Sequence, residues 1–376
     1  MIRMLTAGES HGKGLSVIID GFPAGMTVDV AFINAELNRR QKGYGRGKRM
    51  QIESDEVEIL SGVRNAKTIG SPISLWIKNR DYGNWSGRMN TGPLETDKPV
   101  TAPRPGHADL TGIQKFGLSD VRDVLERASA RETAGRVAAG ALCKQLLKQF
   151  DIRIFSHTIA IGSIMAENTT RSEEETESSA LRCRDAKQEA EMMLSIENAG
   201  ATGNTLGGIS EIVAKNICPG LGTYAQWNRR LDARIAEALM SIPSVKGVFI
   251  GDEDISLRPG SEAQDEIDYK PSEGFYRKSN HAGGVEGGMS NGEDLVVRIH
   301  VKPLPSLGRP LKSVDIISKK SVCAQKERAD VCVVPAAGVV GEAMLAFVLT
   351  QALTDKFGGD SIDDIKTNYQ QYLKRL

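Results

Sequence analysis

Two stretches that are apolar on nearly every face limit the folds open to this chain. Residues 124–150 and 339–357 have the length of long helices and are rich in Ala, Leu and Val. A helix without a polar face is not stable on a protein surface, so other layers must cover it on both sides. We therefore expect these helices to be sandwiched. Residues 28–42 are amphipathic and predict a helix with one exposed face.

Other segments alternate between apolar and polar side chains with period two, at residues 57–63, 73–77 and 295–301. This pattern predicts half-buried strands and favours antiparallel sheets. Residues 169–193 carry an acidic run followed by basic residues, which predicts a solvated surface helix. Because no linker is visible, we treat residues 1–376 as a single α+β domain.

Composition excludes several classes of protein. Lys plus Arg equals Asp plus Glu at 48 each, so no excess charge attracts nucleic acid or a membrane. The five cysteines are far apart and lack CxxC spacing, which argues against disulfides and structural zinc and for reduced thiols in the cytoplasm. The N-terminus lacks the apolar core of a signal peptide, and Pro335, Gly338, Gly341 and Glu342 interrupt the longest apolar run. We expect a cytoplasmic protein without metal.

The first candidate motif is GESHG at residues 8–12. Its glycines let the backbone approach a ligand closely, although a strand-ending turn with a surface histidine is the simpler alternative. Neighbouring side chains on an extended chain point to opposite faces, so Ser10 and His11 do not form a nucleophile–base pair. We interpret His11 as a candidate proton donor.

Arginines gather in two further segments. Arg39 and Arg40 end the amphipathic helix, and GYGRGKR follows at residues 43–49. Guanidinium groups bind phosphate or carboxylate through paired hydrogen bonds. The helix dipole could account for Arg39 and Arg40 but not for the arginines that follow. An RNA-binding Gly-Arg segment is the other alternative, but such segments usually recur and this one does not.

The second arginine-rich segment lies at residues 103–136. PRPGHAD predicts a rigid turn that presents Arg104 and His107, with Asp109 either orienting His107 or capping the next segment. RASARETAGR at residues 127–136 places arginines beside an apolar helix. Their burial is costly unless a bound anion, or alternatively Glu132, compensates the charge.

The glycine-rich loop HAGGVEGGMS at residues 281–290 could bind phosphate or a flat ring through backbone N–H groups, or could be a wide irregular turn. Further on, Arg328-Ala329-Asp330 precedes an apolar segment. Together the motifs indicate a small substrate with two or three negative charges, several arginines, two acid/base histidines and a carboxylate. This set favours phosphate elimination or transfer over hydrolysis.

Five motifs, in this order, resemble the signatures of the chorismate synthase family: GESHG at 8–12, RRQKGYGRGKRMQIESD at 39–55, RPGHAD at 104–109, RASARETAGRVAAGA at 127–141 and HAGGVEGG at 281–288. The resemblance implies a β-α-β sandwich, with central helices packed between two antiparallel sheets, assembled as a homotetramer. It also implies a lyase that uses reduced FMN (FMNH2) to eliminate phosphate from 5-enolpyruvylshikimate 3-phosphate. The product is chorismate, made at the last common step of the shikimate pathway to aromatic amino acids.

The resemblance assigns roles residue by residue. His11 matches the proton donor to the departing phosphate, His107 the histidine beside the flavin, and Asp330 the carboxylate near flavin N5. Substrate binding is implied for Ser10, Arg46, Arg49, Arg104, Arg131 and Arg136. FMN binding is implied for Arg127, Ala128, Ser129, Pro243, Ser244, Gly287, Lys302, Pro303, Leu304, Pro305, Ser306 and Arg328. Arg40 and Arg46 match positions for NADPH.

The chain departs from the family pattern at Ala128, Pro243-Ser244 and Ala329, where Ser, Gln-Ala, and His or Ser are usual. Such changes affect FMN affinity only where the side chain makes the contact. Two other functions are open: a phosphate-ligand or RNA-binding module, which would not need the histidines, and a flavin reductase, which would consume NADPH. We expect NADPH to act only indirectly, through an external flavin reductase, and leave open whether the protein reduces its own FMN.

Overall fold

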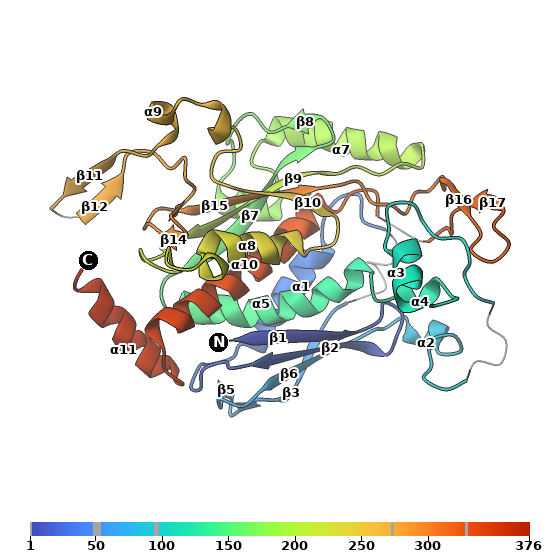
Figure 1. The fold of residues 1–376 in the computed structure, drawn as a ribbon, viewed down its shortest axis with the longest axis horizontal. Coiled ribbons are helices and arrows are strands. Elements are labelled where there is room, and N and C mark those ends of the chain that lie inside the picture. Colours follow the sequence, from blue (N-terminus) through green and yellow to red (C-terminus); the bar gives the residue numbers. More distant parts are fainter. Residues whose placement is uncertain (1, 48–53, 94–97, 272–273, 328–329) are drawn as a thin grey trace.

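Helices and antiparallel sheets are distributed along the whole chain in the computed structural model, which describes residues 2–47, 54–93, 98–271, 274–327 and 330–376 (Figure 1). The α-helices are α1 (Val30–Gln41), α2 (Tyr82–Trp85), α3 (Asp109–Phe116), α4 (Arg122–Leu125), α5 (Thr133–Lys148), α6 (Glu173–Ser178), α7 (Ala186–Ala201), α8 (Leu231–Met240), α9 (Gly260–Ala263), α10 (Val334–Phe357) and α11 (Ile362–Leu373). Short 3-10 helices lie at Ala130–Glu132, Trp227–Arg229 and Ile255–Leu257. The prediction of an α+β chain is confirmed.

The two larger sheets are antiparallel. Their strands run in the orders β1-β2-β6-β3 and β10-β15-β9-β7-β8. These strands are β1 (Arg3–Gly8), β2 (Gly14–Asp20), β3 (Val57–Ser61), β6 (Ile73–Lys78), β7 (Arg153–Ile161), β8 (Ile164–Met165), β9 (Gly208–Lys215), β10 (Val245–Ile250) and β15 (Leu295–Val301). The smaller pairs are β4 (Val63–Arg64) with β5 (Lys67–Thr68), β11 (Ile267–Lys270) with β12 (Gly274–Arg277), β13 (Val285–Glu286) with β14 (Met289–Ser290), and β16 (Lys312–Val314) with β17 (Ser321–Cys323).

Strand β15 shows why the period-two pattern was informative. Leu295, Val297, Ile299 and Val301 are buried, and the residues between them are half-buried. Successive side chains of a strand point to opposite faces, so one face of β15 packs on the core. The strand predictions at residues 57–63, 73–77 and 295–301 are confirmed by β3 with β4, by β6 and by β15.

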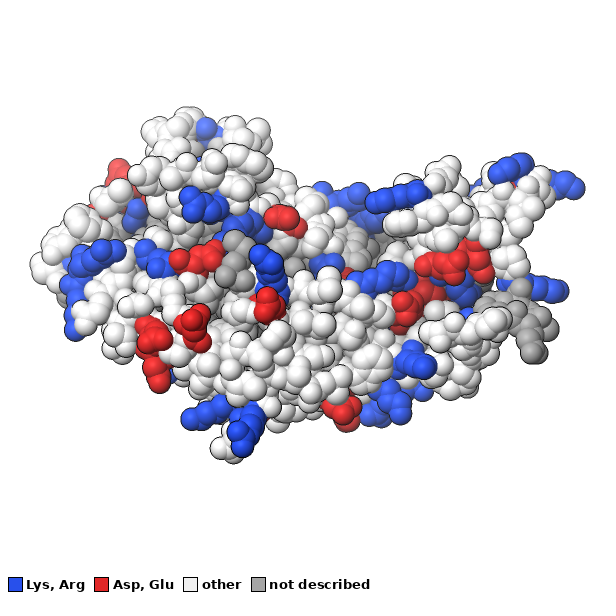
Figure 2. All heavy atoms as spheres, turned by 60° about the horizontal axis from the view of Figure 1, so that its bottom comes forward, with Lys and Arg blue, Asp and Glu red and all other residues white. Residues whose placement is uncertain are grey.

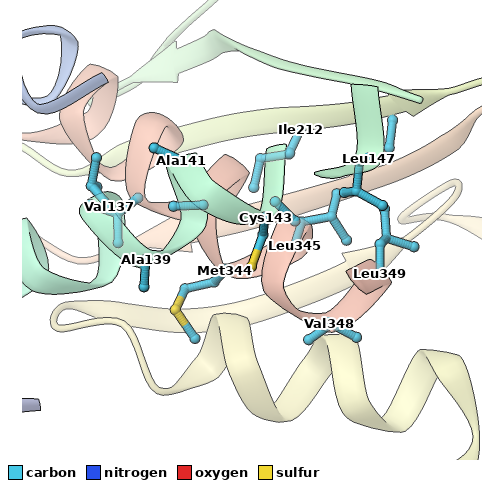
Figure 3. Close-up of a cluster of buried hydrophobic side chains, with 14 of the residues drawn as sticks. Val137, Ala139, Ala141, Cys143, Leu147, Ile212, Met344, Leu345, Val348 and Leu349 are labelled. Atoms are coloured by element: carbon cyan, nitrogen blue, oxygen red, sulfur yellow. The ribbon is translucent and has the colours of Figure 1, made fainter. Parts of the chain in front are cut away.

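The core forms where α5 and α10 pack against each other (Figure 3). Helix α5 contacts β2 and β6 of the first sheet, and α10 contacts β7 and β9 of the second. Small residues allow this packing: a Cβ atom added to Gly140 would lie 2.4 Å from the Cβ of Ala343. The abundance of Ala and Gly in these helices therefore permits backbones to approach closely, and leaves the larger Leu and Val side chains to fill the layer.

Helix α10 is long and apolar enough to cross a membrane by length and composition alone. However, 89% of its most apolar 18-residue window is buried inside the protein. A core helix covered by two layers passes the same compositional test as a membrane span. We therefore describe α10 as a core helix.

Two helix predictions were partly wrong. The segment at residues 124–150 is interrupted because Ser129 is extended and accepts a hydrogen bond from Arg131 N at 3.3 Å, which starts a 3-10 turn before α5. The charged segment at residues 169–193 is not one solvated helix. Ser172 caps α6 and Asp185 caps α7, and the chain between them is largely buried. The capping side chains of Ser172 and Asp185 therefore set where the two helices begin, although the composition predicted one helix.

The buried stretch between α6 and α7 supplies one member of a charged cluster in the core. Glu342 of α10 is fully buried and accepts hydrogen bonds from Arg39 Nη1 at 2.9 Å, Arg182 Nη2 at 2.8 Å and Ser156 Oγ at 2.6 Å. Lys144 of α5 also contacts Glu342. Burial would raise the pKa of Glu342, but Arg39, Lys144 and Arg182 outweigh it and hold the pKa below its ordinary value.

Acidic and basic side chains are interspersed over the face drawn in Figure 2. This distribution agrees with the equal numbers of charged residues of each sign. Among the residues coloured on this face, neither sign forms a broad field that would attract a polyanion. Local concentrations of arginine therefore need a local explanation.

Candidate active site

A cavity of about 680 Å³ collects residues from segments far apart in the chain. The residues that line it belong to the turn between β1 and β2, the end of α1 and the loop after it, the turn before β10 and the start of α10. Others come from within the segments 104–108, 125–133 and 302–306, although not every residue of these segments lines the cavity. This volume lies within the ~300–1,000 Å³ range of small-molecule sites. The cavity is therefore large enough for a small ligand.

Two arginines on one wall share a single carboxylate. Arg131 donates from Nη1 to Asp55 Oδ1 at 2.6 Å and from Nε to Asn79 Oδ1 at 2.8 Å. Arg40, from the last turn of α1, donates from Nη2 to Asp55 Oδ2 at 2.7 Å. Both guanidinium groups and Asp55 are buried. One negative charge thus faces two positive charges.

Burial and the neighbouring charges shift the pKa values of Arg40 and Asp55. Burial lowers the pKa of Arg40 to about 10, with Arg131 and Arg46 acting in the same direction and Asp55 opposing them. Burial would raise the pKa of Asp55, but Arg40 and Arg131 lower it below its ordinary value. Among the described residues, Nη2 of Arg131 and Nε of Arg40 are buried without a hydrogen-bond partner. A bound anion would supply the missing negative charge.

Asp330 lies on the same side of the cavity. Its Oδ2 is 3.0 Å from Nη1 of Arg46, and its Oδ1 accepts a hydrogen bond from Gly47 N at 2.6 Å. Asp330 therefore pairs with the basic loop after α1, across nearly the whole length of the sequence. This contact links the loop to the chain that enters α10.

His11 is held by a carboxylate that the motif does not contain. The ring Nδ1 of His11 lies 2.9 Å from Oε1 of Glu126, and the backbone N of His11 donates to Oε2 of Glu126 at 2.8 Å. The ring also stacks on Trp85, with centroids 4.0 Å apart. Burial would raise the pKa of Glu126, but hydrogen bonds from His11 and the charge of Arg122 lower it below its ordinary value. Glu126 is therefore ionised beside His11.

The second histidine, His107, forms a triad with Asp109 and Arg104 in the PRPGHAD segment. Asp109 Oδ1 contacts His107 Nδ1 at 2.5 Å, and Asp109 Oδ2 accepts from Arg104 Nε at 2.9 Å. Arg104 also donates from Nη1 to Ser306 Oγ at 2.7 Å. Burial would raise the pKa of Asp109, but His107 and Arg104 hold it well below its ordinary value. Asp109 makes no N-cap hydrogen bond, so of the two roles considered for it, orienting His107 fits the geometry.

A family model described as chorismate synthase matches residues 2–354. Chorismate synthase of Carboxydothermus hydrogenoformans is 54% identical over 383 residues, covering 100% of this chain and 99% of its own. Chorismate synthase of Alkaliphilus metalliredigens is 50% identical over 377 residues, covering 99% of each chain. The chain belongs to the chorismate synthase family. A crystal structure of chorismate synthase also matches with a TM-score of 0.81 at 40% identity, covering 100% of this chain and 98% of that one.

Most of the residues to which the chorismate synthase resemblance assigns a role lie on the wall of the cavity. They are Ser10, His11, Arg40, Arg46, Arg104, His107, Ala128, Ser129, Arg131, Pro243, Ser244, Lys302, Leu304, Pro305, Ser306 and Asp330. They come from segments separated by hundreds of residues. Their convergence is what a site for substrate and cofactor requires, and their individual roles stay predictions.

Four described residues with assigned roles in chorismate synthase do not line this cavity: Arg127, Arg136, Gly287 and Pro303. Arg127 donates from Nη2 to Thr6 O at 3.0 Å. Arg136 donates from Nε to Glu132 at 3.1 Å, so internal pairing, the alternative considered for it, fits the geometry. Gly287 lies in the turn between β13 and β14. Arg49, Arg328 and the departure at Ala329 lie outside the described residues.

The FMN that chorismate synthases use can be tested against this cavity. Ile242, Ala336, Ala337 and Val340 give it an apolar wall, and Ser129, Ser244 and Ser306 add hydroxyl groups. Ser244 has φ +73°, a conformation that side chains rarely adopt, and its carbonyl accepts from Lys302 N at 2.8 Å. The apolar wall fits the flat ring of a flavin, and the convergent polar groups fit its phosphate. In the part of the chain described here, no group of three or more His, Cys, Asp or Glu is placed to hold a metal ion.

Sequence reasoning named Asp109 and Glu132 as partners but missed Glu126, Asp55 and Trp85. Glu126 precedes the RASARETAG motif by one position, Asp55 ends the basic motif, and Trp85 lies in no motif. The contact between His11 and Glu126 joins residues 115 positions apart. Only the need of a buried arginine or histidine for a carboxylate could have indicated that such partners exist, and it could not have named them.

Proposed function

We propose that this protein catalyses the 1,4-anti elimination of phosphate from 5-enolpyruvylshikimate 3-phosphate, which gives chorismate. Phosphate leaves with the electrons of the C3–O bond, and the ring double bond shifts toward C3. A new double bond forms at C6 as its hydrogen leaves as a proton, which reduced FMN would accept when bound, and there is no net oxidation. The observation that carries this proposal is a cavity in which buried, incompletely compensated arginines lie with two histidines, each held by a carboxylate. The membership of the chain in the chorismate synthase family supports it.

The arginines account for binding and for the leaving group. The substrate carries a phosphate and carboxylates, and a phosphate dianion leaves poorly unless positive charge gathers where negative charge develops. Arg40, Arg46 and Arg131 supply this charge on one wall and Arg104 on another. Their own carboxylate partners hold the guanidinium groups in fixed positions, so little reorganisation is needed when the anion binds.

The histidines account for proton movement. His11 donates a proton to the departing phosphate oxygen, and Glu126 holds the opposite side of its ring. Asp109 Oδ1 and Arg104 Nη2 both contact Nδ1 of His107, which leaves Nε2 as the nitrogen that exchanges protons in the cavity. Asp330, which Arg46 and Gly47 hold in place, provides a carboxylate on the wall where the cofactor would lie.

Reduced FMN, when bound, supplies transient electron donation to the reacting ring, which is why a redox-neutral elimination needs a reduced cofactor. The residues that would hold it are Ala128, Ser129, Pro243, Ser244, Lys302, Leu304, Pro305 and Ser306. Ser129 stands beside Ala128, and both Ser244 and Lys302 are fixed by their backbone hydrogen bond. The departures at Ala128 and Pro243-Ser244 therefore fall on wall positions.

We also propose a domain organisation, a layer arrangement, an assembly and a source of reductant, each from one observation. One hydrophobic core that runs from Ile2 to Ile365 supports a single domain over residues 1–376. The contacts of α5 with β2 and β6, and of α10 with β7 and β9, support a β-α-β sandwich. We propose, on family membership alone, a cytoplasmic homotetramer with NADPH acting indirectly through an external flavin reductase.

An anaerobic assay with 5-enolpyruvylshikimate 3-phosphate and chemically reduced FMN tests the proposal. Chorismate absorbance and phosphate release should rise together in equal amounts. Oxidised FMN with NADPH, with and without an added flavin reductase, separates intrinsic from external reduction. Net NADPH consumption without a phosphorylated substrate would instead identify a flavin reductase. Absence of product with flavin bound would overturn the proposal.

A further inference from the structure

Glu126 binds one histidine of the cavity, His11, through both its backbone and its ring. Its Oε2 accepts from the backbone N of His11 at 2.8 Å, and its Oε1 lies 2.9 Å from Nδ1 of the ring. Its own backbone O accepts from Ser10 N at 2.9 Å. Glu126 is 2% exposed. The residue before His11, the backbone of His11 and the ring of His11 are thus all bound to one buried residue.

Two further side chains confine the same ring. Trp85 of α2 stacks on His11 with an interplanar angle of 27°. Arg122 donates from Nη1 to Glu126 Oε1 at 3.0 Å and lies over the Trp85 ring, 5.0 Å from its centroid. Arg122 therefore holds both the carboxylate and the aromatic ring that contact His11. The imidazole can neither turn over nor swing away without breaking contacts on two sides.

The chemistry of these contacts fixes the hydrogens. An ionised carboxylate only accepts, so the contact at Nδ1 requires a hydrogen on that nitrogen. Nε2, which Glu126 does not contact, is then the nitrogen left for proton transfer. The carboxylate accepts from the main-chain N–H through Oε2, and the ring Nδ1 lies 2.9 Å from Oε1 and 3.0 Å from Oε2. An amide that keeps its oxygen on the main-chain N–H places its NH2 group beside Nδ1, where it donates instead of accepting, and it carries no negative charge.

We propose that Glu126 is a positioning residue for the elimination: it holds the His11 ring in one orientation with the hydrogen on Nδ1, and stabilises the imidazolium that donates from Nε2 to the departing phosphate. The proton moves from Nε2 to a phosphate oxygen, the Nδ1 hydrogen stays in place, and Glu126 stays ionised. This assignment rests on the proposed function for the role of His11, but the position and tautomer of the ring do not.

A purely structural role for Glu126 is the competing explanation. Glu126 and Arg122 are four residues apart at the end of α4, and such a pair can simply hold a helix. A structural pair would affect unfolding and leave the tautomer of His11 and the chemical step alone. The matched control is Glu189, another buried glutamate, which accepts from Leu181 N at 2.8 Å and contacts Arg171, outside the cavity.

The experiment compares Glu126→Gln, Glu126→Asp and Glu189→Gln with the wild type. Turnover is measured with reduced FMN and saturating substrate, and folding by thermal unfolding. Glu126→Gln should lower kcat by about 100-fold or more with KM changed little, since the effect of a general acid is about 10²–10⁴-fold. Glu126→Asp keeps the charge and should recover part of that loss, and Glu189→Gln should keep wild-type kcat.

Nitrogen-15 NMR of the histidine rings in the ligand-free protein gives a readout that does not depend on activity. The signals of His11 are assigned by their loss in His11→Asn. In the wild type, at a pH where the ring is neutral, Nδ1 should carry the hydrogen, and in Glu126→Gln this preference should be lost. A neutral wild-type His11 with its hydrogen on Nε2 would overturn the proposal even if Glu126→Gln failed to fold. Wild-type kcat in a folded Glu126→Gln would also overturn it. Lack of chorismate formation by the wild type would instead reject the proposed function, and the NMR result would still decide the position of the ring.

Discussion

Asp55 binds two arginines at once: its Oδ1 accepts from Arg131 at 2.6 Å and its Oδ2 from Arg40 at 2.7 Å. The three side chains are buried, so the carboxylate is the main compensation for two positive charges. This arrangement makes Asp55 important both for stability and for presenting the arginines to an anion.

Asp55→Asn should lower the free energy of unfolding by about 3–5 kcal/mol at neutral pH, because it leaves buried charge unpaired. The folded-state pKa of Asp55 is lowered, so its contribution is present above the unfolded pKa of about 3.9 and is lost as the pH falls through the folded value. Urea unfolding of the wild type and of Asp55→Asn should be compared from neutral to acidic pH. The difference between their free energies of unfolding should become smaller in acid. Exposed Asp20→Asn is the control. A difference in the free energy of unfolding that does not change with pH would contradict this account.

Arg131→Ala should weaken binding of 5-enolpyruvylshikimate 3-phosphate by about 1.5–3 kcal/mol, the scale of a charge-assisted hydrogen bond, or roughly 10- to 150-fold. Arg131 lines the cavity and shares the carboxylate of Asp55 with Arg40, so its positive charge is incompletely compensated and stabilises a bound anion. Calorimetric titration measures the change, with exposed Arg64→Ala as the control. Arg131→Lys keeps the charge and should lose less. Unchanged affinity in Arg131→Ala would place this arginine outside the binding site.

His11→Ala and His107→Ala should each lose about two decades of turnover or more, the range for a general acid, while FMN still binds. Stopped-flow absorbance of chorismate measures turnover, and flavin fluorescence measures binding. Wild-type turnover in either variant would remove that histidine from the mechanism.

Gly140→Ala should destabilise the protein by about 1–3 kcal/mol, although alanine is the better helix former. The added Cβ would lie 2.4 Å from that of Ala343, where α5 and α10 pack against each other. Gly260→Ala, whose added Cβ would meet nothing within 4 Å, is the control. Thermal unfolding compares the two, and equal midpoints would mean that the helices separate easily.

Glu342→Ala should lower the free energy of unfolding by about 3–5 kcal/mol, because Arg39, Lys144 and Arg182 would lose their shared carboxylate. Denaturant titration at neutral pH measures the loss. An effect within experimental error would show that water reaches these cations when Glu342 is removed.

The sequence predicted elements whose signal is local. The alternation in β15 and the apolar composition of α5 and α10 depend only on neighbours along the chain. The predictions for β15 and α10 are confirmed, and the prediction for residues 124–150 is confirmed for the part that forms α5. Family membership, inferred from motifs, is confirmed as well. The break at Ser129 and the cap at Asp185 were missed because a single side-chain hydrogen bond decided each one.

The site was predicted less completely, for a different reason. Motifs supplied the histidines and arginines, since these carry the chemistry. Their carboxylate partners Glu126 and Asp55 were not identified, because a partner is defined by distance in space and both pairs join separate segments. Arg127 and Arg136 were expected in the pocket, yet the structure binds them to the β1 backbone and to Glu132.

Arg39 and Arg40 are consecutive residues, yet they serve different parts of the molecule. Arg39 reaches Glu342 in the core, and Arg40 reaches Asp55 beside the cavity. Because Arg39 and Arg40 share one helical turn, the backbone position of Arg40 depends on the bond between Arg39 and Glu342. Glu342 does not line the cavity, so a ligand there does not touch it. Substitutions around Glu342 can change the affinity for an anion, and a tightly bound anion can make the core harder to unfold, because the last turn of α1 is common to both.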